Sequence, residues 1–272
     1  MIDFQKIIRE TDLYNLHTHT QYCDGHAPME EFVTEAIAMG FTHLGFTPHS
    51  PVSVESPCNM TREQVPEYFD EINRLRSVYG DRINLYTSME IDYLSVGDGP
   101  ADEYFCQLPL DYRIGSVHFI PAIDNPGEMV DIDGKFPAFK ARMTKHFDCD
   151  IVYVVKTFFS QMMAMVEEGG FDIVGHMDKI GFNASQYLNG IDEEPWYDKL
   201  VIDLFENIMD HTWSSRSTPR HGCSAIVSIP TSSTSGCSSV SMLPWWSTAT
   251  PIIPRCSTAA AWRPSNCLTC CK

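Results

Sequence analysis

The sequence contains no acidic residue over its last 62 positions. All 36 Asp and Glu residues lie within positions 1–210, and none occurs from His211 to Lys272. Over the whole chain they outnumber the 19 Lys and Arg residues, which gives a formal net charge of −17 at pH 7. A nucleic-acid-binding protein needs a basic face that displaces counterions from phosphates. The charge therefore argues against a nucleic-acid partner.

Long hydrophobic runs are also missing. No window approaches the roughly 18 apolar residues of a membrane-spanning helix, and residues 1–10 lack the basic-then-apolar pattern of a signal peptide. The cysteines of positions 1–210, namely Cys23, Cys58, Cys106 and Cys149, show no paired spacing. Unpaired cysteines suit a reducing compartment. We therefore expect a cytoplasmic protein without a membrane segment.

The segment 211–272 differs in composition from the rest of the chain. Ser and Thr supply 22 of its 62 residues, and its six cysteines lack the spacing of a zinc ribbon. A low-complexity linker is one interpretation. A frameshift is the other: back-translating Trp246–Pro254 and starting two nucleotides later permits Val-Asn-Ser-Asp-Ala-His-Tyr-Pro. We predict a domain at 1–210 and an aberrant, irregular or disordered tail at 211–272, produced by a frameshift.

The first 210 residues alternate short apolar segments with amphipathic helices. Strands are predicted near 13–17, 42–47, 83–91, 112–118 and 172–176, and helices near 28–40, 61–80, 151–168 and 195–209. Repeated strand-then-helix order implies parallel strands joined by crossover helices. The carboxyl ends of such strands converge on one face of an α/β barrel.

Histidines and one glutamate recur at these strand ends. His17 and His19 lie two residues apart and so project from the same face of a strand, and imidazole suits ions such as Zn, Mn and Fe. Glu90 interrupts an apolar strand and would be costly to bury unless it were paired or bound to metal. The candidate residues are His17, His19, His49, Glu90, His118 and His176.

Five motifs around these residues resemble those of the polymerase and histidinol phosphatase (PHP) family, in particular its monofunctional histidinol-phosphatase branch. The motifs are His17-Thr-His19-Thr-Gln-Tyr-Cys-Asp24-Gly, Gly45-Phe-Thr-Pro-His49-Ser-Pro, Met89-Glu90-Ile-Asp-Tyr, Ile114-Gly-Ser-Val-His118 and Val174-Gly-His176-Met-Asp. The resemblance covers about residues 12–180. It implies an α/β fold, a distorted (β/α)7 TIM-like barrel whose last two strands are here replaced by the aberrant tail.

The resemblance also implies a site for two to three divalent metal ions, Zn, Mn or Fe. The implied ligands are His17 and His19 for the first metal, Glu90 as a bridge, His118 and His176 for the second metal, and His49 with Asp24 or His26 for the third. Of the last two we favour Asp24. No catalytic residue beyond the ligands is implied.

The implied activity is hydrolysis of a small-molecule phosphate ester, L-histidinol phosphate, to L-histidinol and phosphate in histidine biosynthesis, by attack of a metal-activated hydroxide. Two alternatives remain. One is another PHP-type phosphoesterase. The other is a catalytically defective chain, because the family pattern demands a late Ser-Asp-Ala-His segment that is found only in the shifted frame.

Overall fold

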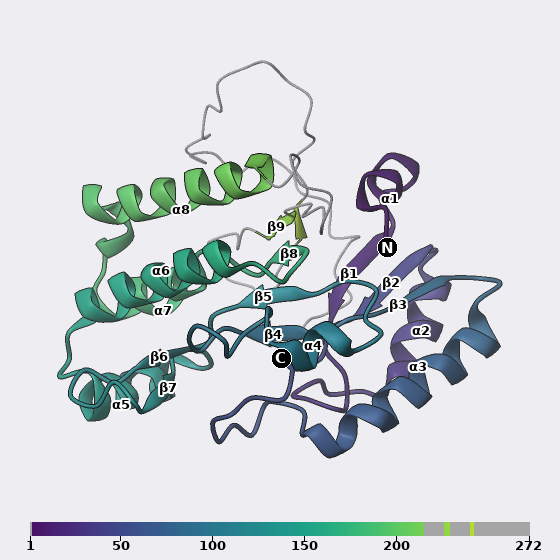
Figure 1. Ribbon diagram of the computed structural model, residues 1–272, viewed down its shortest axis with the longest axis horizontal. Coiled ribbons are helices and arrows are strands. Elements are labelled where there is room, and N and C mark those ends of the chain that lie inside the picture. Colours follow the sequence, from purple (N-terminus) through teal and green to yellow (C-terminus); the bar gives the residue numbers. More distant parts are fainter. Residues whose placement is uncertain (1, 215–225, 229–239, 242–272) are drawn as a thin grey trace.

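The computed structural model describes residues 2–214, 226–228 and 240–241, with side chains for residues 2–211 (Figure 1). The helices are α1 (Phe4–Glu10), α2 (Met29–Ala38), η1 (Arg62–Gln64), α3 (Val65–Tyr79), α4 (Glu103–Gln107), α5 (Phe136–His146), α6 (Ile151–Glu168), α7 (Lys179–Tyr187), η2 (Ile191–Glu193) and α8 (Pro195–Ser214). The strands are β1 (Tyr14–Thr18), β2 (His43–Phe46), β3 (Asn84–Thr87), β4 (Glu90–Asp92), β5 (Ile114–Ser116), β6 (Phe119–Pro121), β7 (Met129–Asp131), β8 (Ile173–Val174), β9 (Ile226–Ser228) and β10 (Val240–Ser241).

The strands form two main sheets and a hairpin. β1, β2 and β3 pair in parallel, in that order. The second sheet has the order β10-β9-β8-β5-β4 and is parallel except for the β9–β10 pair. β6 and β7 form a separate antiparallel hairpin. Parallel strands linked by helices bring their carboxyl ends to one edge, where the functional residues of such folds gather.

One stretch of chain, residues 84–92, belongs to both main sheets. Its first half, β3, pairs with β2, and its second half, β4, pairs with β5. A parallel bridge between His49 and Glu90 continues the pairing past the end of β2. Tyr68 on α3 supports the break between β3 and β4, because its hydroxyl donates a hydrogen bond to the carbonyl oxygen of Ser88 at 2.8 Å. Glu90 therefore lies where the two sheets join.

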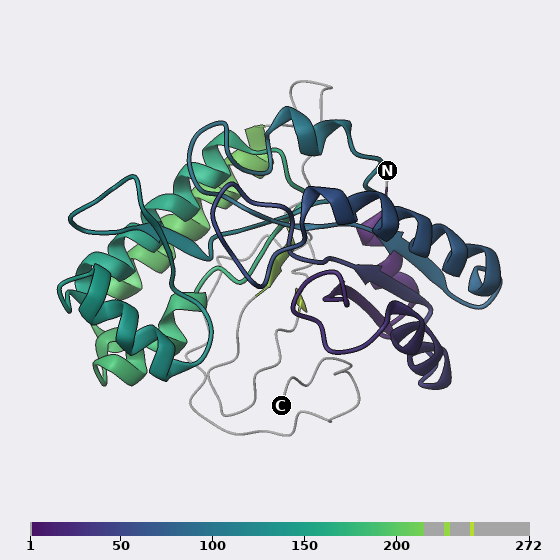
Figure 2. The same ribbon diagram turned by 90° about the horizontal axis from the view of Figure 1, so that it is seen from below.

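Two groups of helices flank the strands: α2 and α3 on one side, and α5 to α8 on the other (Figures 1 and 2). α2 and α3 cover a hydrophobic cluster that includes Val33, Ile72 and Leu75, all fully buried. α3 follows a capping box between Thr61 and Gln64, which satisfies backbone N–H groups at the helix start.

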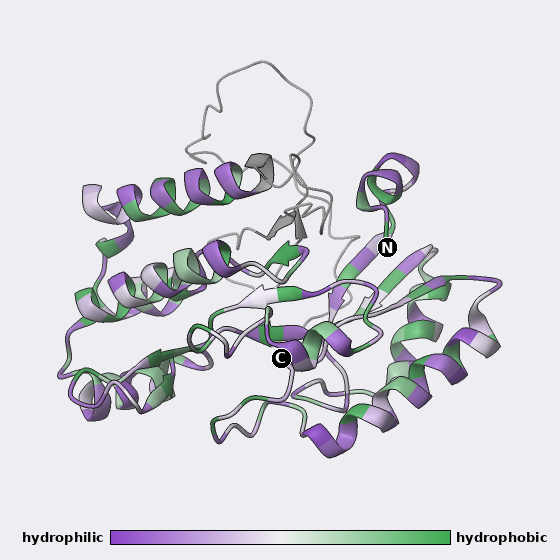
Figure 3. Cartoon of the chain, viewed as in Figure 1, coloured by the Kyte–Doolittle hydropathy of each residue, from purple (hydrophilic) through white to green (hydrophobic). Residues whose placement is uncertain are grey.

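α6 is the central helix of the largest hydrophobic cluster. It begins where the Asp150 side chain accepts a hydrogen bond from the Tyr153 N–H at 2.9 Å, and it ends at Gly169, whose φ of +76° favours glycine. Phe158 and Phe159 are fully buried on this helix. Hydrophobic residues lie along the sides of α6 and α8 that face each other (Figure 3).

The structure contains a strand in each of the five segments predicted within 1–210, although most are shorter than predicted. The predicted single strand at 83–91 is divided between two sheets by a break at Ser88 and Met89. The β6–β7 hairpin and the helices α1, α4, α5, α7 and η2 were not predicted from the sequence. β6 and β7 have three residues each, too few to show an alternating pattern.

The predictions for the tail fall mainly on residues outside those that the structure describes. Of the tail, the structure describes the end of α8, β9 and β10. β9 pairs in parallel with β8, and β10 pairs antiparallel with β9. The strand pairings among the described residues do not close the barrel. The irregular structure of the tail and its origin in a frameshift stay predictions.

Among the described helices, none alone has the length and hydropathy that a membrane-crossing segment requires. α5 and α6 meet these criteria only as a pair, and they are bent by 100° relative to each other.

Candidate metal centre

A fully buried carboxylate, that of Glu90 in β4, is the centre of the site. The Ser116 hydroxyl on the neighbouring strand β5 donates a hydrogen bond to Glu90 Oε1 at 2.7 Å. In the parallel pairing of β4 with β5, Ser116 is the partner of Asp92, two residues after Glu90, so the Ser116 and Glu90 side chains share one face of the sheet. An anionic side chain buried in this way requires positive or hydrogen-bonding partners.

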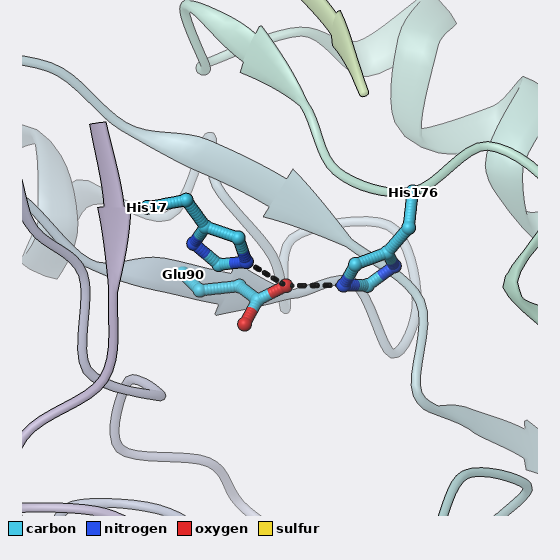
Figure 4. A group of neighbouring side chains, drawn as sticks. All are labelled: His17, Glu90 and His176. Carbon is cyan, nitrogen blue, oxygen red and sulfur yellow. Dashed lines mark ion pairs between the residues drawn. The ribbon is translucent and has the colours of Figure 1, made fainter. Parts of the chain in front are cut away.

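Three imidazoles approach the Oε1 atom of Glu90. The Nε2 atoms of His176, His118 and His17 lie 2.7, 3.6 and 3.7 Å from it. In Figure 4, His17 and His176 point toward Glu90 from opposite sides. These histidines come from β1 and from the segments that follow β5 and β8, so three separate strand ends contribute to one cluster.

Two further imidazoles approach Oε2, the other oxygen of Glu90. His19 Nε2 lies 3.1 Å from it and His49 Nδ1 lies 3.3 Å from it. Asp24 extends this side of the site, with its Oδ1 atom 2.6 Å from His19 Nδ1 and 3.9 Å from His49 Nε2. Both carboxylate oxygens of Glu90 are thus surrounded by ring nitrogens.

Polar side chains contact the Nδ1 atoms of three of the imidazole rings. His17 Nδ1 lies 2.7 Å from Thr47 Oγ1, and His118 Nδ1 lies 2.7 Å from Asp92 Oδ1. His19 Nδ1 has the contact with Asp24 described above. A hydrogen bond at one ring nitrogen fixes the orientation of the ring and directs the other nitrogen. In all three rings the directed atom is Nε2, which faces Glu90.

Burial and charge separate the pKa values of these groups. Burial lowers the pKa of His17 to about 3 and that of His49 to about 4, and it also lowers the pKa of His176. These three imidazoles are therefore neutral at pH 7. Burial would lower the pKa of His118 too, but the charges of Asp92 and Glu90 raise it to about 9.

Glu90, which is fully buried, and Asp24, whose side chain is 44% exposed, both remain carboxylates. Burial by itself would raise both pKa values. The surrounding histidines hold the pKa of Glu90 well below its usual range, and the hydrogen bond and charge of His19 hold that of Asp24 at about 2. Burial would lower the pKa of His19, but its hydrogen bonds to Asp24 and Glu90 outweigh burial and raise that pKa. At pH 7 the site therefore combines two carboxylates with neutral imidazoles at His17, His49 and His176 and protonated ones at His19 and His118.

The donor set fits divalent transition metals. Four groups of side chains have ligand atoms within 4.8 Å of one another: His17–Glu90–His176, His19–His49–Glu90, His19–Cys23–Asp24 and His49–Asp92–His118. His49 Nδ1 is buried without a hydrogen-bond partner, so its lone pair is available to a cation. Imidazole nitrogens with carboxylate oxygens are suitable ligands for Zn, Mn and Fe.

Comparison with known families agrees with these motifs. The PHP domain matches residues 15–211, which is well over half of the chain. The chain belongs to the PHP family. Its open α/β barrel is the PHP-type fold predicted from the motifs.

Several proteins with histidinol-phosphatase names are similar to this chain. A probable histidinol-phosphatase of Deinococcus radiodurans is 26% identical over 200 residues, which are 71% of this chain and 69% of that protein. A histidinol-phosphatase of Lactococcus lactis is 32% identical over 111 residues, which are 41% of this chain and 40% of that enzyme. The match therefore spans just over two thirds of the first relative and less than half of the second.

A solved structure shows the same fold. It is that of a Listeria monocytogenes protein with a provisional histidinol-phosphatase name, and it has a TM-score of 0.61 and 18% sequence identity. The similarity covers 73% of this chain and 79% of that protein.

The structure brings together all seven side chains predicted from the PHP motifs: His17, His19, Asp24, His49, Glu90, His118 and His176. His26, the alternative to Asp24, is exposed and belongs to none of the potential metal-binding groups of the described residues. Sequence reasoning assigned no role to Asp92. Its position two residues after Glu90, on the same face of the strand, was the available signal.

Proposed function

We propose that this PHP protein is a metal-dependent phosphomonoesterase that hydrolyses L-histidinol phosphate to L-histidinol and phosphate. The observation that carries the proposal is the buried Glu90 carboxylate, with five imidazoles within 3.7 Å of its two oxygens. The histidinol-phosphatase names of the relatives support the substrate. A cytoplasmic location belongs to the same proposal.

The proposed ligands are the seven residues predicted from the motifs, with Asp24 rather than His26 beside His49. Two to three divalent ions, Zn, Mn or Fe, would make a water molecule more acidic and neutralise charge on the phosphoryl oxygens. The protein itself supplies orientation: Thr47, Asp24 and Asp92 hold three imidazoles with Nε2 toward Glu90. Glu90 supplies two oxygens and can therefore contact two cations at once.

The substrate assignment is tested by phosphate release. The metal-loaded full chain is assayed with L-histidinol phosphate beside a panel of sugar phosphates and nucleotides. We expect a kcat/KM for histidinol phosphate at least about tenfold above that of the others. Equal values across the panel would exclude this substrate and favour another PHP phosphoesterase.

A substitution at the central carboxylate tests the site. Glu90→Gln keeps the shape of the side chain but removes the charge, and we expect it to abolish both turnover and metal retention. Glu167→Gln, on an exposed part of α6, is the matched control and should keep both. Normal turnover by the Glu90 variant would refute the metal-centre assignment.

We also propose that the tail 211–272 is a frameshift product, and that this chain is catalytically weakened because it lacks the late Asp and His ligands. Two observations support this: the acidic residues stop at Asp210, and the PHP match ends at residue 211. Elemental analysis and turnover of the full chain test it together. If the chain binds two to three metal ions and its turnover equals that of a full-length relative, the proposal that it is catalytically weakened is wrong.

A further inference from the structure

One cationic side chain at the rim of the metal centre has no part in the function proposed above. Lys179 is the first residue of α7, and its backbone N–H donates a hydrogen bond to the carbonyl oxygen of His176 at 3.0 Å. The helix thus begins within one turn of a histidine that contacts Glu90. The Lys179 side chain is 32% exposed, so it is not sealed inside the protein.

Asp133 holds this ammonium group in place. The Lys179 Nζ and Asp133 Oδ2 atoms are 3.0 Å apart. Asp133 follows Ile132, whose N–H donates a hydrogen bond to the carbonyl oxygen of His118 at 2.9 Å. The two partners of the ion pair therefore come from backbone segments fixed to His176 and His118, whose Nε2 atoms are 3.3 Å apart.

The carboxylates around Lys179 keep it cationic. Burial opposes the charge of Lys179, but the carboxylates of Asp133, Glu90 and Asp24 raise its pKa above the usual value. The ammonium is therefore cationic at neutral pH and lies in the field of the carboxylates that form the site.

The ion pair is not needed to hold α7 in position. Asn183, one turn further along the helix, donates from Nδ2 to the carbonyl oxygens of Ile132 and Gly134 at 3.4 and 3.3 Å. Ala184, the next residue, is fully buried. An ion pair between two side chains that are each about one third exposed contributes little to stability. The position of Lys179 is therefore better explained by binding than by packing.

We propose that the Lys179 ammonium group binds a non-bridging phosphoryl oxygen of the substrate, and that Asp133 positions it for this contact. An ammonium group has three N–H donors, and the contact with Asp133 leaves donors for an anion. Hydrogen bonds between charged partners are about twice as strong as neutral ones. The inference rests on the proposed phosphatase function, but it concerns the phosphate and is independent of the alcohol released.

Inorganic phosphate is the probe for this contact. Its Kd is measured by calorimetry on the metal-loaded full chain, with metal content and melting temperature determined for every variant. Lys179→Met should weaken phosphate binding by on the order of ten- to hundredfold, the effect of losing a charge-assisted hydrogen bond. Its metal content should not change.

Lys199→Met is the matched control. It removes a lysine that pairs with Asp203 at 2.7 Å on the exposed side of α8, and its phosphate Kd should stay within about twofold of that of the unaltered chain. If the phosphate Kd of Lys179→Met also stays within about twofold of that of the unaltered chain, the proposal is overturned. Absence of phosphate binding by the unaltered, metal-loaded chain would also overturn it.

A second pair of variants covers the case in which Lys179→Met loses its metal ions. Lys179→Arg keeps the positive charge and Lys179→Gln removes it, so the arginine variant must bind phosphate more tightly; equal affinities would overturn the proposal. None of these readouts involves turnover. Failure to hydrolyse histidinol phosphate would therefore refute the proposed substrate and leave the phosphate result to stand.

Discussion

Asp92→Asn offers the sharpest test of how the metal centre is held together. Asp92 is fully buried in β4 and accepts hydrogen bonds with both oxygens: Oδ1 lies 2.7 Å from His118 Nδ1, and Oδ2 lies 3.0 Å from Asn59 Nδ2. An amide in its place has one acceptor and one NH₂ donor. In either orientation, the NH₂ group of the amide faces another donor, which is His118 Nδ1 or Asn59 Nδ2. The variant must therefore lose one of the two contacts.

The expected magnitude follows from the role of this contact. Asp92 orients His118, and removing a partner that orients a metal-binding histidine lowers metal affinity about 10- to 100-fold. This corresponds to about 1.4–2.8 kcal/mol of binding free energy. Competition with a chromogenic chelator measures the affinity directly, and circular dichroism confirms that the variant is folded.

The control for this experiment is Asp124→Asn, at an exposed position away from the histidines. It should change metal affinity by less than about twofold. A folded Asp92→Asn protein with the metal affinity of the unaltered chain would show that His118 needs no support from Asp92, and the proposed geometry of the centre would be wrong.

Three further predictions concern the fold and the tail. Gly45→Ala should destabilise the protein by about 1–3 kcal/mol in urea unfolding, because the new Cβ would overlap the buried Tyr112 hydroxyl. Gly127→Ala is the control and should not destabilise the protein, because its new Cβ would make only an ordinary contact with Asn125. Phe158→Ala in the core of α6 should cost about 3–5 kcal/mol and the exposed Phe182→Ala less than about 0.5 kcal/mol; similar losses in the two variants would contradict the described packing. Independent sequencing of the coding DNA around His211 should reveal a single-base insertion or deletion, and an uninterrupted frame in all reads would remove the frameshift proposal.

The histidine and glutamate positions could be predicted because each follows a short apolar strand in a repeated strand–helix order. Helix α6 was predicted near its observed limits, Ile151–Glu168, since two glycines directly follow it. These signals are local in sequence. They required no knowledge of which segments meet in space.

The features that escaped prediction depend on contacts between distant segments. Asp92 is recognisable only when His118 and Asn59 are seen beside it, and the Lys179–Asp133 pair joins α7 to the loop after β7. The β6–β7 hairpin is held by pairing between three-residue strands rather than by strand propensity. Tertiary contacts of this kind leave no periodic pattern in the sequence.

The break between β3 and β4 determines where this protein can change in length. β3 is fixed to β2 before the break, and β4 is fixed to β5 after it. One residue added between Thr87 and Glu90 would have to fit beside Ser88 and Met89, which are both fully buried, or it would shift β4 by one residue against β5 and turn Glu90 toward the opposite face of the sheet. Surface loops can gain residues at little cost. The short path from Thr87 to Glu90 is therefore the segment in which insertions and deletions should be least tolerated across evolution.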